Sequence, residues 1–254
     1  MSSACAALID DLVSANHILF VEGVVDGFGH VSVRHDRRDD HFLLACGVAP
    51  ATVTAEDIVE VDYDGVVHDD AGRRSYLERY IHSEIYKARP DVMAVVHSHS
   101  PAIIPFGVTR ATLRPVCHMS GFLGLSTPVF EIRDTAGEDN DMLVKNAALG
   151  KALAASLGPH QFALMRGHGS VTVAHSLKLA VARAIWAEMN ARLQSEAMRV
   201  AALAGHAGDA DGGVRYLTAG EAKGSMAINE TVVDRPWDFW KSRAKAALAG
   251  MTRI

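Results

Sequence analysis

Three things are scarce in this sequence of 254 residues: cysteine, an excess of positive charge and long apolar runs. The three cysteines are scattered, without the spacing of a zinc site or of a disulfide framework, which favours a reduced, cytoplasmic setting. Lysine and arginine number 25 against 30 for aspartate and glutamate, and this balance argues against nucleic acid or an anionic membrane as the main partner. No apolar run approaches the roughly 18–20 residues of a membrane span, and the first residues lack the cationic start of a signal peptide.

Hydrophobic residues and histidine are, by contrast, plentiful. A hydrophobic share of 49% beside 22% charged residues is a normal globular balance, which excludes a disordered chain. The length and the lack of any linker or repeat predict a single domain over residues 1–254. The 13 histidines prompt a search for a metal site, although surface histidine is the ordinary explanation for most of them.

Local patterns predict interleaved helices and strands. Apolar residues at helical spacing, with start and stop signals, predict helices over residues 4–22, 76–88, 140–157, 176–203 and 237–249. Apolar or alternating runs predict strands over 31–35, 42–44, 59–62, 92–96, 162–165 and 170–173, with a hairpin turn at Asp64-Gly65. Because hairpins accompany this alternation, we expect a mixed sheet covered by helices on both faces, in the α/β class.

Two histidines stand at the end of a predicted strand. Residues i and i+2 of a strand point to the same side, so His97 and His99 direct both imidazoles to one point at the sheet edge. Neutral imidazoles suit a divalent first-row metal; the alternative is a pair of partly exposed side chains where the strand frays. His168 offers a third ligand, because the flanking Gly167 and Gly169 let the backbone approach closely, although an ordinary hairpin turn would also explain it.

Glu78 and His82 are four residues apart on a predicted helix and therefore share one face. Charged residues at this spacing are usually solvated, and we expect His82 to be a solvated side chain of this kind. Glu78 is of interest because of the histidines that follow it in the sequence.

Together these residues resemble the class II aldolase and adducin-like family. The pattern extends over roughly residues 5–205 and has four pieces in order: Glu-x-x-x-His from Glu78, Arg-Pro-Asp from Arg89, His-Ser-His-Ser-Pro from His97 and His-Gly at His168. The resemblance implies a three-layer α/β/α fold around a central, mostly antiparallel mixed sheet of nine strands. It also implies a homotetramer with sites near the subunit interfaces.

The same resemblance implies a divalent metal on His97, His99 and His168, with Glu78 beside it as the acid and base. Mn²⁺ is favoured, and Zn²⁺, Fe²⁺ and Co²⁺ are alternatives, because all of them accept three histidine ligands. The apolar last helix offers surface for subunit contacts, and its aromatic side chains are explained by core or interface packing better than by a substrate cage: Trp237, Phe239 and Trp240.

The phosphate-binding loops of the family's sugar-phosphate aldolases are replaced here. Those loops carry a Gly-Asn pair, a Ser/Thr-Gly pair and a Ser-Ser pair, where this sequence reads Gly29-His30, Cys46-Gly47 and Arg74-Ser75-Tyr76. The small hydroxyl and amide donors are largely absent, which argues against a phosphorylated substrate. The segments 114–124 and 128–134 resemble instead the decarboxylase branch of the family. That branch acts on hydroxylated aromatic or pyridine carboxylates, such as 3-hydroxy-2-methylpyridine-4,5-dicarboxylate and dihydroxyphthalate.

This resemblance implies a small-molecule carboxylate as substrate. A carboxylate beside a ring hydroxyl can bind a metal through both oxygens, and the metal acts as a Lewis acid while CO₂ leaves. Glu78 would give the proton to the ring, a role that requires a pKa raised by partial burial. Other substrate carboxylates require hydrogen-bonding or cationic partners, for which the candidates are His30, Ser75 and His118, with Arg133 and Arg166 as unranked alternatives; each also has a plain structural explanation.

Two other functions stay open. A class II aldolase or epimerase would use the same metal site, and an unphosphorylated hydroxy-acid substrate would not need the missing loops. A non-catalytic scaffold of the adducin type typically needs no metal. The intact set of three histidines and Glu78 argues against a scaffold, because no structural role requires three converging imidazoles.

Overall fold

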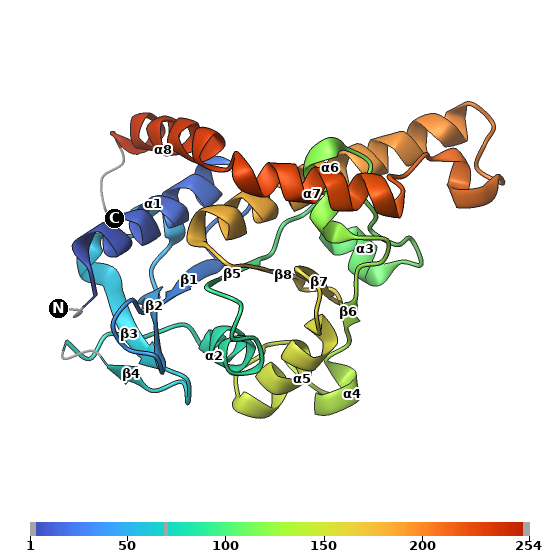
Figure 1. The fold of residues 1–254 in the computed structure, drawn as a ribbon. Coiled ribbons are helices and arrows are strands. Elements are labelled where there is room, and N and C mark those ends of the chain that lie inside the picture. Colours follow the sequence, from blue (N-terminus) through green and yellow to red (C-terminus); the bar gives the residue numbers. More distant parts are fainter. Residues whose placement is uncertain (1–3, 69–70, 251–254) are drawn as a thin grey trace.

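An eight-stranded sheet runs through residues 4–68 and 71–250, the part of the chain that this computed structural model describes (Figure 1). The strand order is β4-β3-β2-β1-β5-β8-β7-β6, and every neighbouring pair is antiparallel except β6 and β7. The strands are β1 (His30–Arg34), β2 (His41–Ala45), β3 (Ile58–Asp62), β4 (Val67–His68), β5 (Ala94–Ser98), β6 (Val129–Phe130), β7 (Phe162–Met165) and β8 (Gly169–Ala174). The mixed, mostly antiparallel sheet is confirmed, with eight strands in these residues instead of nine.

Helices and short 3₁₀ turns connect these strands. The α-helices are α1 (Ala6–Val21), α2 (Arg79–Ala88), α3 (Ile104–Val108), α4 (Arg133–Ala136), α5 (Ala147–Leu157), α6 (Leu177–Leu203), α7 (Ala219–Thr231) and α8 (Asp234–Leu248). The 3₁₀ turns are η1 (Pro50–Thr52), η2 (Ala55–Asp57), η3 (His118–Leu123) and η4 (Ala210–Gly213).

Alternation along each strand sorts the apolar side chains into two cores. In β2, Leu43 packs in the cluster that contains Leu12 of α1, whereas Phe42 packs in the cluster that contains Ile81 of α2. The first core is covered by α1, α6 and α8, and the second by α2 and α5 (Figure 1). Burial on both faces explains why the strands read as nearly continuous apolar runs. The expected three layers are therefore confirmed.

The helix predicted over residues 140–157 is shorter than expected. It begins at Ala147, because the side chain of Asn146 caps it by accepting a hydrogen bond from the backbone N–H of Leu149. Before the cap, Met142 has a φ of 63°, which a right-handed helix cannot contain. The apolar spacing in this segment therefore overstated the length of α5.

The C-terminal region contains a helix that the sequence patterns did not reveal. Thr218 and Glu221 form a capping box at the start of α7, and this Thr-x-x-Glu pattern is a signal that the sequence carried. In α8, Trp237 and Trp240 are buried in the first core, whereas Phe239 is 61% exposed. Core packing therefore explains the two tryptophans, as expected.

Within the described residues, no helix is both long enough and apolar enough to cross a membrane. The single domain over residues 1–254 stays a prediction. It includes residues 1–3, 69–70 and 251–254, which lie outside the described residues.

Candidate metal centre

The end of β5 places His97 in the middle of the sheet. His97 lies opposite His30 of β1 and opposite Val171 of β8, and its side chain is fully buried. Its Nδ1 lies 3.0 Å from the carbonyl oxygen of Ser170. Because a carbonyl can only accept, Nδ1 carries the proton, and Nε2 of the neutral ring presents a lone pair.

His168 occupies the tight turn between β7 and β8, and two glycines make this turn fit. Gly167 has a φ of 66°, in the left-handed region that glycine adopts without strain. A Cβ on Gly169 would lie 1.9 Å from the carbonyl oxygen of Ser98, so only glycine lets the turn pack against the end of β5. The turn therefore carries His168 to the histidines of β5.

The three imidazoles meet through the same ring nitrogen. Nε2 of His99 lies 3.0 Å from Nε2 of His97 and 2.9 Å from Nε2 of His168. Burial, followed by the neighbouring imidazoles, lowers the pKa of His99 to about 4. The ring of His99 is therefore neutral at pH 7, as a metal ligand must be.

Glu78 completes the group from the start of α2. It is the N-cap residue, immediately before the helix, and its Oε1 accepts a hydrogen bond from the backbone N–H of Val144 at 2.9 Å. Its Oε2 lies 3.5 Å from Nε2 of His97 and of His168. Burial would raise the pKa of this carboxyl, but the two histidines that face it outweigh burial and hold the pKa well below 4.5. The raised pKa expected from the sequence is therefore wrong for these contacts.

The donor set fits a divalent cation. Ligand atoms of Glu78, His97, His99 and His168 lie within 4.8 Å of one another. Metal–nitrogen bonds of about 2.0–2.1 Å bring coordinating nitrogens to separations near 3 Å, similar to those found here. The hydrogen bond from His97 Nδ1 to a backbone carbonyl is the kind of support that orients a metal-binding imidazole. These residues could hold one metal ion.

His82 is a correction to the sequence analysis. It was expected to be solvated, yet it is fully buried, and its Nε2 lies 2.6 Å from Nδ1 of His30. The reason is that α2 packs with this face against the sheet, where the β1 side chains of His30 and Ser32 meet it. The sequence held a signal for this contact, because residues 30 and 32 alternate with apolar Val31 and so share one face of β1.

The other predicted substrate residues lie in different settings. His30 borders the cluster, with its ring centroid 5.0 Å from that of His97. The hydroxyl oxygen of Ser75 is buried without a hydrogen-bond partner among the described residues. His118 is exposed on η3, and its ring has no recorded contact with the cluster in the described part of the chain. Arg133 and Arg166 both pair with Glu131.

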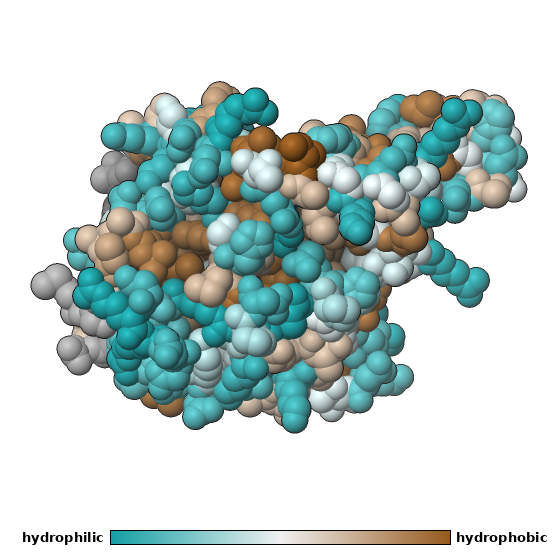
Figure 2. Space-filling model, viewed as in Figure 1, coloured by the Kyte–Doolittle hydropathy of each residue, from teal (hydrophilic) through white to brown (hydrophobic). Residues whose placement is uncertain are grey.

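A large cavity lies elsewhere in the molecule. A space of about 1100 Å³ opens beside α1 and β3, and its walls include Ile9, Val13, Ile58 and Glu60. Figure 2 shows a hydrophobic recess in this part of an otherwise largely hydrophilic face. None of the four cluster residues lines this space. The convergence of ligand atoms, rather than cavity size, therefore locates the candidate chemistry.

The fold and the cluster together define a class: a three-layer α/β protein with three histidines and a glutamate at the end of a central strand. The chain belongs to the family described as Class II Aldolase and Adducin N-terminal domain, which residues 10–195 match.

Similar proteins include named decarboxylases. The chain is 37% identical over 240 residues to the decarboxylase tropJ of Talaromyces stipitatus, with 90% of each chain covered. It is 28% identical over 222 residues to the 3,4-dihydroxyphthalate decarboxylase of a Terrabacter species, covering 82% of this chain and 87% of the relative. The solved L-fuculose 1-phosphate aldolase of Glaciozyma antarctica has a TM-score of 0.75 and 23% identity, covering 98% of this chain and 92% of that one. This last likeness shows the fold alone.

Proposed function

We propose that this protein is a divalent-metal-dependent decarboxylase of an aromatic or pyridine carboxylate, or dicarboxylate, that bears a hydroxyl next to the departing carboxylate. The observation that carries the proposal is the convergence of three imidazole Nε2 atoms and Glu78, in a chain whose relatives include decarboxylases. Dihydroxyphthalate and 3-hydroxy-2-methylpyridine-4,5-dicarboxylate are representative substrates. His97, His99 and His168 would hold the metal, with Mn²⁺ favoured over Zn²⁺, Fe²⁺ or Co²⁺.

The reaction replaces the carboxylate with a proton on the same ring carbon. The carbon–carbon bond breaks, CO₂ leaves, and the electron pair of that bond ends in the new carbon–hydrogen bond. A divalent metal supplies Lewis-acid stabilisation of the developing charge on the ring hydroxyl oxygen. Glu78 would transfer the proton, and its place beside the histidines and its anchor on Val144 N–H support this role. Because the neighbouring histidines hold the pKa of Glu78 low, it would first take up the proton that it delivers.

Substrate recognition would rest on groups that replace the family's phosphate loops. His30 is the strongest candidate because it borders His97, and Ser75 is supported by its unpartnered, buried hydroxyl. His118 is exposed on η3, and we propose that it serves a site at a subunit boundary. A homotetramer with sites near its interfaces is therefore part of this proposal. Light scattering that finds an active, stable monomer would remove it.

The decisive experiment combines metal analysis with a substrate panel. The purified protein should contain a divalent metal, and it should release CO₂ from hydroxylated ring acids that include 3,4-dihydroxyphthalate. Methylation of the hydroxyl next to the departing carboxylate should abolish turnover, because this oxygen must take up the developing charge. Rapid turnover of the methyl ether would contradict the mechanism.

The same panel separates the alternatives. Retro-aldol cleavage of a sugar-derived substrate in preference to every ring acid would favour an aldolase or epimerase, which the aldolase-like fold accommodates. A protein without metal and without turnover would favour the scaffold.

A further inference from the structure

Behind the candidate metal cluster, four buried side chains form one continuous line of hydrogen bonds. His30 Nδ1 lies 2.6 Å from His82 Nε2, and His82 Nδ1 lies 2.6 Å from the Oγ of Ser32. This oxygen lies 2.7 Å from the hydroxyl of Tyr86. The line begins beside His97 and ends in the second core, and none of its members belongs to the cluster of ligand atoms.

The buried phenol of Tyr86 sets the direction of this line. Its proton needs an acceptor, and Ser32 Oγ is the only side-chain acceptor that the described residues place within hydrogen-bonding distance. If Ser32 donated to Tyr86 instead, a buried O–H group would lose its hydrogen bond, which is costly in a core. Tyr86 therefore donates to Ser32.

The donor and acceptor roles of the other hydrogen bonds, up to His30, follow from this first one. Ser32 has one proton, and because the Tyr86 hydroxyl is the donor in their contact, the acceptor left for this proton among the described residues is Nδ1 of His82. Because Nδ1 of His82 accepts this hydrogen bond, it carries no proton of its own. His82 therefore carries its proton on Nε2 and donates it to His30 Nδ1. His30 is left with its proton on Nε2.

We propose that Tyr86, Ser32 and His82 are positioning residues that fix the tautomer of His30, so that His30 presents a neutral Nε2–H donor to a carboxylate of the substrate. This inference rests on the proposed function for the identity of the acceptor. Nε2 of His30 has no hydrogen-bond partner among the described residues. It is also not among the fully buried nitrogen and oxygen atoms of these residues that lack a partner. It lies on the ring edge away from His82.

The tautomer matters because an ionised carboxylate only accepts hydrogen bonds. A Nε2–H group attracts it, whereas the opposite tautomer would turn a lone pair towards it. The line of hydrogen bonds would thus select a ring acid that keeps a second carboxylate. It also explains why polar side chains of β1 and α2 meet beside the second core.

The first test reads the tautomer directly. The Zn²⁺-loaded protein, labelled with ¹⁵N in its histidine rings, would be studied by long-range ¹H–¹⁵N NMR, with His30→Gln used to assign the signals of His30. We expect a protonated Nε2 and an unprotonated Nδ1. A protonated Nδ1 on His30 would overturn the inference.

A matched pair of variants tests the cause. His82→Gln keeps an N–H donor for His30 Nδ1, whereas His82→Leu removes it. The single tautomer should survive in His82→Gln and become a mixture in His82→Leu, and an unchanged His30 spectrum in His82→Leu would overturn the inference. If His82→Leu does not fold, Ser32→Ala and Tyr86→Phe carry the test, since each removes one step of the line. A single Nε2–H tautomer of His30 in both of these variants would then overturn the inference.

Kinetics on 3,4-dihydroxyphthalate provide the second readout. Loss of one hydrogen bond to a charged group should raise KM by about 10- to 100-fold in His82→Leu, with kcat changed by less than about threefold. His82→Gln should restore KM, and a kcat loss in His82→Leu with an unchanged KM would count against the inference. If no ring acid is turned over at all, the proposed function fails, and the NMR tautomer alone decides for or against the positioning line.

Discussion

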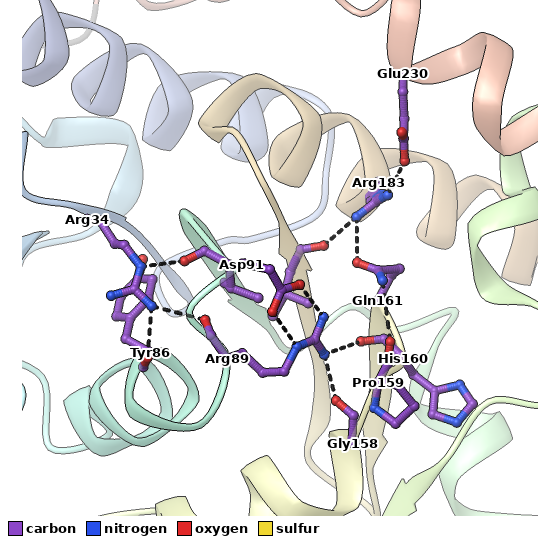
Figure 3. A network of polar contacts seen from close by, with 12 residues as sticks. Arg34, Tyr86, Arg89, Asp91, Gly158, Pro159, His160, Gln161, Arg183 and Glu230 are labelled. Carbon is purple, nitrogen blue, oxygen red and sulfur yellow. Dashed lines mark hydrogen bonds and ion pairs between the residues drawn. The ribbon is translucent and has the colours of Figure 1, made fainter.

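The two ends of β5 carry polar groups of opposite character. After Val96, the side chains of His97 and His99 meet His168 and Glu78, and their ligand atoms crowd together. Near the other end, where β5 begins at Ala94, three arginines donate to separate carbonyl and carboxylate oxygens (Figure 3): Arg34, Arg89 and Arg183. The histidine end brings metal-ligand atoms of the same kind together, whereas the arginine end pairs hydrogen-bond donors with acceptors.

The arginine end is a network of donors paired with acceptors. Arg34 donates to the carbonyl oxygens of Tyr86 at 2.8 Å and Arg89 at 3.0 Å. Arg89 in turn donates from Nη1 to the carbonyl oxygen of Gly158 at 2.6 Å and pairs with Asp91 through Nε and Nη2. These bonds join the end of α2 to the end of α5, where backbone carbonyls lack helical partners.

The two ends show that one sequence pattern of a family can contain both structural and functional residues. Arg-Pro-Asp and His-Ser-His belong to the same pattern, yet the Arg89–Asp91 pair satisfies carbonyls and holds elements together. His97 and His99 leave Nε2 atoms that no protein donor satisfies fully, which is the condition for binding an ion. We therefore expect substitutions at the two ends to separate activity from stability.

Removal of a histidine ligand should have the largest effect. His97→Ala should lose its metal and reduce turnover by on the order of 10³-fold or more, because several kcal/mol of Lewis-acid stabilisation disappear. Elemental analysis and CO₂ release on the proposed ring acids check both effects. His175→Ala, at an exposed histidine outside the cluster, is the control and should keep both. Wild-type metal occupancy in both His97→Ala and His99→Ala would contradict the site.

Glu78→Gln should lower activity but keep the metal. Gln preserves the shape and can still accept the hydrogen bond from Val144 N–H, but it cannot transfer a proton. We expect kcat to fall by about 10²–10⁴-fold. Glu84→Gln, at a buried glutamate of α2 that pairs with Lys87, is the matched control and should retain turnover. A kcat for Glu78→Gln close to that of the control would exclude Glu78 as the proton donor.

At the arginine end the effect should be on stability. Arg89→Ala leaves two backbone carbonyls and Asp91 without their donor, and we expect the free energy of unfolding to fall by about 2–3 kcal/mol. Urea unfolding measures this loss. Arg89→Lys should recover only part of it, because an ammonium cannot bind the carboxylate and the carbonyls in the same planar geometry. Metal content should be unchanged in both variants, and a loss of metal would show that the two ends are not independent.

The sequence predicted the histidine end better than the rest of the site. Strand periodicity and the two glycines around His168 are local signals, and together with the family resemblance they placed three imidazoles in one site. The expected rise in the pKa of Glu78 was wrong. This pKa depends on histidines that are far from Glu78 in the sequence, and no local pattern contains that contact.

The errors elsewhere have the same origin. His82 was taken for a solvated residue because its helical spacing to Glu78 is a local fact, whereas its burial comes from the packing of α2 on β1. The start of α5 was missed because a cap at Asn146 overrode favourable apolar spacing. Fold class followed from the interleaved pattern, and tertiary contacts decided the details.

His82 connects the two ends, since its line of hydrogen bonds runs from His30 to Tyr86, whose ring lies under Arg34. The last effect that we predict is a pH dependence of stability. Burial is the main cause that lowers the pKa of His82 from 6.5 to about 3. The charge of His97 lowers this pKa further, whereas the charge of Glu78 opposes the shift.

Between pH 6.5 and pH 3 the unfolded chain therefore binds a proton at His82 that the folded chain does not bind. Stability from this residue is complete above pH 6.5 and is lost as the pH falls, by up to about 1.4 kcal/mol per pH unit. His82→Gln has no such proton, so its free energy of unfolding should fall less steeply across this range. Urea unfolding of both proteins at several pH values, each loaded with metal, measures the difference. Parallel curves would mean that the pKa of His82 is the same in the folded and the unfolded chain, which would contradict its lowering by burial.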